Sequence, residues 1–194
     1  MTLVGAMLGL LGSGGPMGIK GLTLPPMASI SGGSSLESVV HNEKPLDRQR
    51  WRGIVIHHSG APYGTPESLT AQARRANLSG LGYHFLVGNG SGMGDGDIHV
   101  GYRWLDQLPG AHAIGPQAQA YNQHSIGICL IGDGNRRPFS DLQIQRLAEL
   151  VASLARELDI PADRILLQSD IAESASPGRY FPEAAFREYL DGLM

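Results

Sequence analysis

The residues most able to do chemistry in this chain are histidines and one tyrosine, which lie at the ends of apolar segments or in an irregular loop: His57, His58, Tyr83, His84 and His112. Imidazole binds metals and transfers protons, and a phenol hydroxyl can assist a water molecule or a developing oxyanion. From pattern alone, a single histidine in a strand more often has a packed structural role than a role as a metal ligand. Because adjacent strand residues face opposite sides of a sheet, His57 and His58 are expected to have different surroundings.

Other sequence features exclude several kinds of site. The single cysteine, Cys129, excludes a disulfide framework within the chain and a zinc site built from paired thiolates. Cys129 lies in an apolar run and is expected to be an inert core thiol. The segment Gly88–Gly92 carries alternating glycines but is not followed by a helix, so it predicts a hairpin loop and not a phosphate-binding turn.

The composition predicts one folded domain of ordinary size. The chain has 194 residues, of which 42% are hydrophobic and 17% charged, so a substantial core is possible. The formal net charge is −3, and lysines and arginines form no long cluster. A nucleic-acid partner is therefore not expected, because phosphate binding needs concentrated positive charge.

Strand-like and helix-like segments alternate along the chain, which predicts an α/β fold with a central mixed sheet flanked by helices. The expected strands are residues 53–57, 83–87, 98–104, 125–131 and 164–167, with 98–104 as the return strand of a hairpin. The expected helices are 66–77, 141–158 and 182–193. Thr65 and Ser140 are predicted N-caps, and Gln143 completes a capping-box pattern with Ser140.

Residues 1–45 are rich in Gly, Ser and Pro and predict a leader and linker, with the folded domain at 46–194. The apolar run Leu3–Leu11 is too short to span a bilayer but has the length of a signal-peptide core. No basic residue precedes Lys20. Both a signal-like segment and a plain Gly-rich leader therefore fit, and no transmembrane span is expected.

Four segments together resemble the motifs of the N-acetylmuramoyl-L-alanine amidases of the peptidoglycan recognition protein and phage-lysozyme type: Trp51–Gly60, Gly82–Gly88, Gly110–Ile128 and Ser169–Pro182. Their order and spacing agree with that family from Arg50 to Pro182. The resemblance implies a single amidase domain with a groove on one face. It also implies hydrolysis of the amide between the muramic acid lactyl group and L-alanine in peptidoglycan.

The resemblance further implies a zinc ion held by three protein ligands. His57 matches the first ligand, and Tyr83 matches a catalytic tyrosine beside the metal. Gln168 stands at the second ligand position, where the family has His, and Ser176 stands at the third, where it has Cys. The resemblance places the following residues in the substrate groove: His58, His84, His112, Asn122 and Ser174.

Gln168 and Ser176 are eight residues apart, which is the family's spacing, so they occupy true ligand positions. Amide and hydroxyl oxygens are poor zinc ligands compared with imidazole and thiolate. We therefore expect zinc binding to be weak or absent, and His57, Tyr83, Gln168 and Ser176 to converge at one end of a groove.

Three functions fit these observations. The first is a working amidase, based on His57 and Tyr83. The second is a non-catalytic peptidoglycan or muropeptide-binding protein, based on Gln168 and Ser176 together. The third is an envelope module that binds a protein partner. We expect an amidase-family domain that acts on peptidoglycan with weak or no hydrolysis, located in the cell envelope, either periplasmic or secreted.

Overall fold

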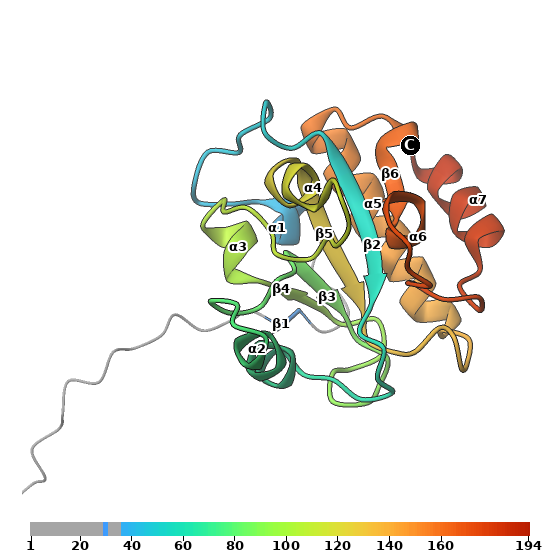
Figure 1. Ribbon diagram of the computed structural model, residues 1–194. Coiled ribbons are helices and arrows are strands. Elements are labelled where there is room, and N and C mark those ends of the chain that lie inside the picture. The colour runs from blue at the N-terminus through green and yellow to red at the C-terminus, as the bar shows by residue number, and fades with distance from the viewer. Residues whose placement is uncertain (1–28, 31–35) are drawn as a thin grey trace, which may run out of the picture.

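The computed structural model describes residues 29–30 and 36–194 (Figure 1). The signal-like run Leu3–Leu11 and most of the expected linker lie outside the described residues. Within the described part, no helix combines the length and apolar character needed to cross a bilayer.

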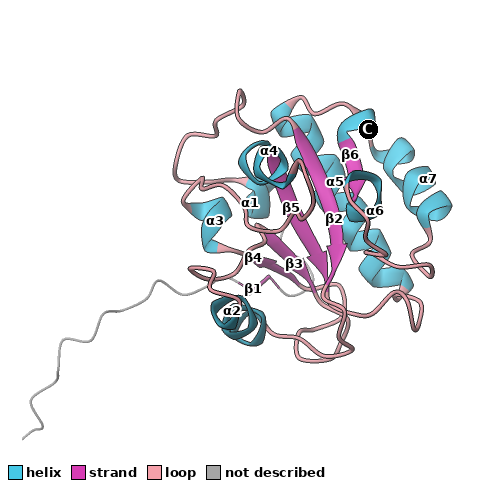
Figure 2. Cartoon of the chain, in the orientation of Figure 1, coloured by secondary structure: helices cyan, strands magenta, loops and turns pink. Residues whose placement is uncertain are grey.

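The centre of the molecule is one mixed sheet, as the sequence predicts (Figure 2). Its strands are β1 (Ser29–Ile30), β2 (Gly53–His58), β3 (Phe85–Val87), β4 (Ile98–Val100), β5 (Ser125–Leu130) and β6 (Ile165–Leu167). Their order across the sheet is β1-β4-β3-β5-β2-β6. Strands β3, β5, β2 and β6 run parallel, whereas β4 pairs antiparallel with β3 and with β1.

Helices cover both faces of this sheet. They are α1 (Leu36–Val40), α2 (Pro66–Arg75), α3 (Tyr102–Leu105), α4 (Ala118–His124), α5 (Asp141–Leu158), α6 (Gln168–Ile171) and α7 (Glu183–Leu193). Helix α5 lies behind the sheet in Figure 1 and packs against α1 and α7, while α4 and α6 lie in front. We call the side that carries α4 the front face.

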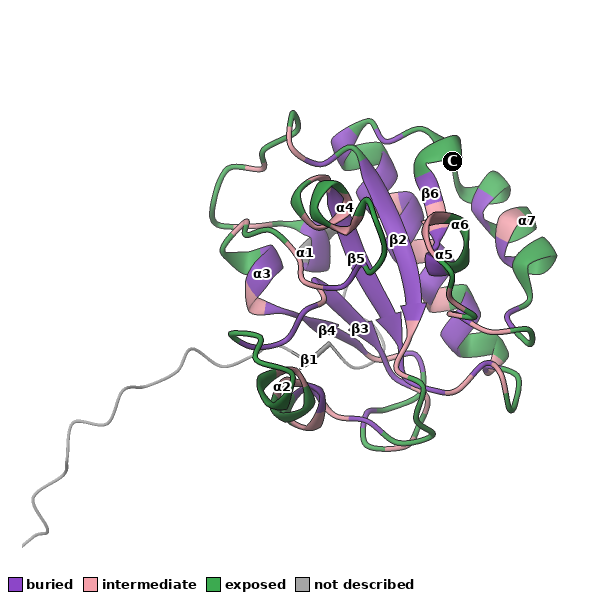
Figure 3. Ribbon diagram, viewed as in Figure 1, coloured by how far each residue is buried: buried purple, intermediate pink, exposed green. Residues whose placement is uncertain are grey.

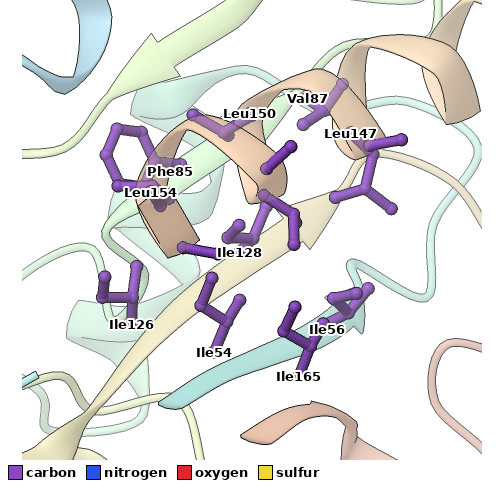
Figure 4. Close-up of a cluster of buried hydrophobic side chains, with 14 of the residues drawn as sticks. Ile54, Ile56, Phe85, Val87, Ile126, Ile128, Leu147, Leu150, Leu154 and Ile165 are labelled. Carbon is purple, nitrogen blue, oxygen red and sulfur yellow. The ribbon is translucent and has the colours of Figure 1, made fainter. Parts of the chain in front are cut away.

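The main core lies between the sheet and α5 (Figure 4). Strand alternation sends Ile54 and Ile56 of β2 toward α5, together with Ile126 and Ile128 of β5. Helix α5 packs against these residues with an apolar stripe at helical spacing, which includes Leu147, Leu150 and Leu154. Strand β5 is buried along its whole length and β2 is buried from Gly53 to His57, as Figure 3 shows, so they form a rigid platform for the residues at their ends.

The front face carries a smaller apolar cluster and smaller side chains. Leu86 and Cys129 pack there with Leu69 of α2. Cys129 is fully buried, as expected for a core thiol. On β2, alternation places Val55 and His57 on this face, opposite to Ile54 and Ile56.

Two predicted helix starts are confirmed, one with a difference. The hydroxyl of Thr65 accepts from the Ser68 backbone N–H, and the Ser68 hydroxyl accepts in turn from the Thr65 N–H. Ser140 caps α5 by accepting from the N–H of Gln143. The predicted second hydrogen bond of the capping box, between the Gln143 side chain and the Ser140 backbone, is wrong. The Gln143 side-chain nitrogen instead donates to the carbonyls of Val87 and Ile131 and so links the ends of two strands.

The strand expected over residues 98–104 is wrong in its second half. The strand ends at Val100, and Tyr102–Leu105 form the short helix α3. The helical turn packs the Trp104 ring against two other rings. Its centroid lies 6.2 Å from that of Trp51 and 5.1 Å from that of Phe85. Burial of this large ring overrides the β-propensity of the aromatic residues.

The packed core begins ahead of Leu46, where the sequence predicts the domain boundary. Helix α1 packs against α5, and its Val39 and Val40 are buried members of the main core. The first strand, β1, adds to the free edge of β4. Five residues of helix are too few to give a clear periodic signal, which explains why composition alone assigns this segment to a linker.

Candidate functional site

A cavity of about 220 Å³ opens on the front face at the end of β2. Its walls are formed by His57, His58, Ser59, Gly60, Tyr83, His112, Ile114, Gln168, Ser174 and Ser176. The four positions that the family resemblance assigns to zinc and catalysis are thus all on its walls. His84 and Asn122, which the resemblance assigns to the substrate groove, are not among the lining residues.

His57 is held by a short chain of hydrogen bonds. Its Nε2 lies 3.0 Å from Nδ1 of His112, and Nε2 of His112 lies 3.2 Å from the Ser125 carbonyl oxygen. A carbonyl only accepts, so His112 Nε2 carries a proton and, in a neutral ring, Nδ1 does not. His57 Nε2–H therefore donates to His112, which leaves His57 Nδ1 as an unprotonated acceptor.

Both imidazoles of this pair are held neutral. Burial lowers the pKa of His57 well below its ordinary value, with smaller contributions from His112 and His58. Burial also lowers the pKa of His112 to about 4. The desolvation of the charged form is the common cause, because neither ring has an acidic partner among the described residues. At neutral pH the pair contributes hydrogen-bonding groups and no charge.

The His112 loop is supported by Asn122 of α4. The Asn122 side-chain oxygen accepts from the backbone N–H groups of His112 and Ala113 at 2.8 Å and 2.9 Å. Glycines at 110 and 127 leave room for the His112 ring, because a Cβ at either position would overlap it. Asn122 therefore positions the loop and does not itself reach the cavity wall.

His84 is a fully buried support beneath the same ring. Its Nδ1 accepts from the Gly127 N–H at 2.9 Å, and its Nε2 lies 3.1 Å from the Leu108 carbonyl oxygen. Burial lowers the pKa of His84 to about 3. With both nitrogens bonded to backbone, His84 fixes the fold behind the cavity and has no free group for a ligand.

Tyr83 stands beside His57 at the cavity. The two rings meet edge to face with centroids 5.3 Å apart, and the Tyr83 ring also lies 6.4 Å from that of His112. Burial raises the pKa of Tyr83 well above its ordinary value, with Cys129 adding to the effect. The phenol therefore stays protonated and offers a hydroxyl.

Gln168 reaches the cavity because of strand register. Leu167 pairs with Ile56 in the parallel β2–β6 ladder, so the next residues, Gln168 and His57, come out at the same edge of the sheet. Only 2% of Gln168 is exposed, and neither its side-chain oxygen nor its nitrogen has a hydrogen-bond partner. Asp170 accepts from the Leu167 N–H at 2.7 Å and so caps the turn behind the site, as its sequence position suggests.

Ser176 is tied to both ends of the site. Its hydroxyl oxygen accepts from the His58 N–H at 2.9 Å, and its carbonyl accepts from the Ser169 N–H at 2.9 Å. The Ser174 hydroxyl accepts from the Ser176 N–H at 3.2 Å. These bonds hold Ser176 beside His57 and leave its hydroxyl proton free to be donated.

The donor set around the cavity does not fit a zinc ion. Within residues 29–30 and 36–194, no group of three His, Cys, Asp or Glu side chains is arranged to hold a metal. The lining offers His57 Nδ1 with neutral amide and hydroxyl groups, and no thiolate or carboxylate. Zinc favours imidazole, thiolate or carboxylate ligands, usually three of them in a catalytic site.

Sequence reasoning missed Ile114, Ser59 and Gly60 on the wall and Gly127 beneath it. Ile114 is 57% exposed at the cavity rim. A sequence pattern does indicate the role of Gly127, because Ser125, Gly127 and Cys129 alternate with larger aliphatic residues along β5. Small residues on one face of a strand indicate that a bulky group packs against that face.

Comparison with known proteins identifies the family and the fold. Residues 47–179 match the family described as N-acetylmuramoyl-L-alanine amidase. The chain is 30% identical over 111 residues to peptidoglycan-recognition protein 2 of Holotrichia diomphalia, covering 53% of this chain and 50% of that one. It is 30% identical over 105 residues to the endolysin of Enterobacteria phage T3, covering 50% of this chain and 58% of the phage protein. The chain thus spans about half the length of these relatives.

Solved structures show the same fold. The endolysin N-acetylmuramoyl-L-alanine amidase LysCS from Clostridium intestinale superposes with a TM-score of 0.62 at 25% identity, over 76% of this chain and 89% of that chain. Bumblebee PGRP-SA gives a TM-score of 0.56 at 22% identity, over 70% of this chain and 80% of that chain, which supports the fold alone. With the family match over more than half of its length, the chain belongs to the N-acetylmuramoyl-L-alanine amidase family.

Proposed function

We propose that this chain is a muropeptide-binding member of the amidase family that hydrolyses the muramoyl-L-alanine amide weakly or not at all. The ligand enters the cavity at the end of β2, where His57, Tyr83 and Ile114 contact it. A peptidoglycan ligand places this work in the cell envelope, in the periplasm or outside the cell.

The observation that carries the proposal is the pair of side chains at the two remaining ligand positions. Gln168 presents a neutral carboxamide, and the Ser176 oxygen already accepts a backbone hydrogen bond from His58. The amidase family is zinc-dependent in general. Here His57 is the single residue of good ligand type among the three positions.

Ligand number sets the expected metal affinity. Structural zinc sites with four good ligands have apparent binding free energies of about 10–16 kcal/mol, or about 2.5–4 kcal/mol for each ligand. One imidazole alone corresponds to roughly millimolar affinity. A dication in this cavity would also face no anionic side chain, so its desolvation would go uncompensated. We therefore expect the purified protein to hold little zinc at neutral pH.

Binding does not require those ligands. The cavity keeps an apolar rim at Ile114, an aromatic wall at Tyr83 and several hydrogen-bonding groups, which together suit a neutral sugar-peptide junction. One structural relative is a point mutant of the Drosophila protein PGRP-LB, solved in complex with tracheal cytotoxin. Its likeness of 20% identity supports only the fold, so the ligand class assigned to this chain is our proposal.

The test measures three quantities on the full chain: zinc content at neutral pH, binding of a soluble muropeptide by calorimetry, and release of stem peptide from purified peptidoglycan. We expect substoichiometric zinc, measurable binding and little release. Tight zinc with chelator-sensitive release would show a working amidase. Absence of muropeptide binding would overturn the ligand assignment and favour a protein partner.

A matched pair of exposed apolar substitutions locates the binding surface. Ile114→Ser changes the cavity rim, whereas Tyr189→Ser changes the exposed surface of α7, outside the cavity. Only Ile114→Ser should weaken muropeptide binding. Equal effects of the two substitutions, or a loss confined to Tyr189→Ser, would place the binding surface elsewhere.

A further inference from the structure

The carboxamide of Gln168 lacks every partner that a buried amide normally has. Both its oxygen and its nitrogen are shut away from solvent without a hydrogen bond. Gln143, the other buried glutamine with an unpaired atom, still uses its nitrogen for two backbone carbonyls. Buried polar groups are almost always hydrogen-bonded in native proteins. Two side-chain atoms without hydrogen bonds at a cavity wall therefore indicate that a ligand supplies their partners.

The other cavity groups restrict what that ligand is. The Ser176 hydroxyl proton is free, because its oxygen accepts from the His58 backbone, and His57 Nδ1 is free to accept. The lining carries no Asp, Glu, Lys or Arg side chain that would balance a charge, and its basic groups are the imidazoles of His57, His58 and His112. A ligand that fits this set is neutral and offers both an N–H donor and a carbonyl acceptor.

The shape of the Gln168 carboxamide further restricts which chemical group of a ligand can pair with it. Its oxygen accepts and its adjacent N–H donates, side by side in one plane. An extended peptide residue presents its own N–H and C=O along one edge in the same way. Free carboxylates and ammonium groups, which amide hydrolysis produces, each lack one half of this pattern.

We propose that Gln168 recognises the uncleaved junction between muramic acid and the stem peptide, by pairing its carboxamide with the N–H and C=O of the first alanine. The Gln168 oxygen accepts from the N–H of the muramoyl amide, and its nitrogen donates to the carbonyl of the same alanine. This assignment rests on the proposed function and gives the substituted ligand position a role in selecting intact ligand. The cavity volume of about 220 Å³ is enough for this junction, while the rest of the ligand lies outside.

The test compares two small ligands on the full wild-type chain. One is an N-acetylmuramoyl dipeptide with the natural amide. The other is its depsipeptide analogue, in which an ester oxygen replaces the amide N–H and no bulk is added. Loss of one buried hydrogen bond is expected to weaken binding about tenfold or more. Equal affinity for amide and ester in the wild type would overturn the proposal.

Two variants test whether the preference for the amide over the ester depends on Gln168. Gln168→Met keeps the side-chain length without hydrogen bonds, and we expect it to bind the amide and the ester equally, both more weakly than wild type binds the amide. Gln145→Met, on the exposed surface of α5, should keep the wild-type preference. A preference that persists in Gln168→Met would refute the role of Gln168.

The outcomes also separate this inference from the proposed function. Binding without cleavage, but with equal affinity for amide and ester, would retain the proposed function and reject the role of Gln168 in recognising the amide. The same conclusion would follow if the Gln168 carboxamide proved to bind only an ordered water. Failure to bind either ligand, or rapid cleavage of the amide ligand that a chelator abolishes, would reject both. The wild-type comparison needs no variant, so the test stands even if Gln168→Met folds poorly.

Discussion

His57 Nε2 and His112 Nδ1 lie 3.0 Å apart, although the two residues are 55 positions apart in the chain. Since His112 is anchored on the Ser125 carbonyl, this contact determines which nitrogen of His57 carries the proton. The outcome is a fixed ring that presents Nδ1 as an acceptor. The front face of β5 therefore sets the hydrogen-bonding character of a residue on β2.

Gly127 is the position at which this arrangement is most easily disturbed. A Cβ at Gly127 would overlap the His112 ring, so Gly127→Ala must displace the ring or the strand. We expect a loss of about 1–3 kcal/mol in the free energy of unfolding, the usual cost of overpacking, together with weaker muropeptide binding. Urea denaturation and calorimetric titration measure the two effects.

Gly192→Ala is the matched control for that substitution. No atom lies within 4 Å of a Cβ built at Gly192, which belongs to α7. Alanine is a better helix former than glycine, so this variant should gain up to about 1 kcal/mol and bind normally. A Gly127→Ala protein as stable as Gly192→Ala would show that the His112 ring has more freedom than this packing allows.

The buried histidines predict a loss of stability in mild acid. In the unfolded chain a histidine takes up a proton below about pH 6.5, whereas burial lowers the folded pKa to about 4 for His112 and about 3 for His84. Between these values the unfolded state binds more protons, so stability falls as pH falls. The slope is about 1.4 kcal/mol per pH unit for each histidine.

Substituting His84 tests this pH dependence. Gln at position 84 keeps an acceptor for the Gly127 N–H and a donor for the Leu108 carbonyl, but it does not titrate. Urea denaturation between about pH 7 and about pH 5 should show a shallower dependence for His84→Gln than for wild type. Gln145→Met, a non-titrating substitution on the exposed surface of α5, should leave the slope unchanged, and identical slopes in all three proteins would contradict the prediction.

Much of the fold follows from local pattern. The alternation of Ile54, Val55 and Ile56 and the helical stripe of α5 are strong periodic signals, and both elements form where the sequence predicts them. Helices α3 and α6 have four residues each, which is too short for a periodic signal. Tertiary packing of residues such as Trp104 determines these short elements.

The candidate site is predicted only in part for a related reason. The family resemblance indicates His57, Tyr83, Gln168 and Ser176, and all four line the cavity. The supporting roles of His84 and Asn122 depend on contacts with distant backbone groups, which no local pattern encodes.

The N-terminal boundary gives a further prediction. A protein that begins at residue 29 keeps β1 and α1, whereas one that begins at residue 46 loses Val39 and Val40 from the core. Burial of two valines contributes about 3 kcal/mol or more, so the shorter protein should melt roughly 6–12 °C lower. Calorimetry on both proteins measures this difference, and equal Tm values would restore the boundary at Leu46.

The final prediction concerns the two substituted ligand positions. Gln168→His together with Ser176→Cys should restore zinc binding and raise muramoyl-L-alanine amidase activity, while either change alone should do little. Metal analysis after dialysis and release of stem peptide from peptidoglycan measure the two gains. Gln72→His with Ser79→Cys, on the exposed surface at and just after the end of α2, beside Arg74 and Arg75, is the control and should gain neither.

The expected non-additivity follows from ligand counting. One added ligand joins His57 to make two, which hold the ion weakly, whereas two added ligands complete a three-ligand site with an open position for water. His57 Nδ1 is already unprotonated because Nε2 donates to His112, and Tyr83 already lies beside it. Groups that act as a unit show strong coupling, so the double variant should exceed the sum of the single variants by a wide margin. If the wild type released peptide as fast as the double variant and lost that activity to a chelator, other ligands would have to compensate, and Asp170 and Glu173 would be the first to substitute.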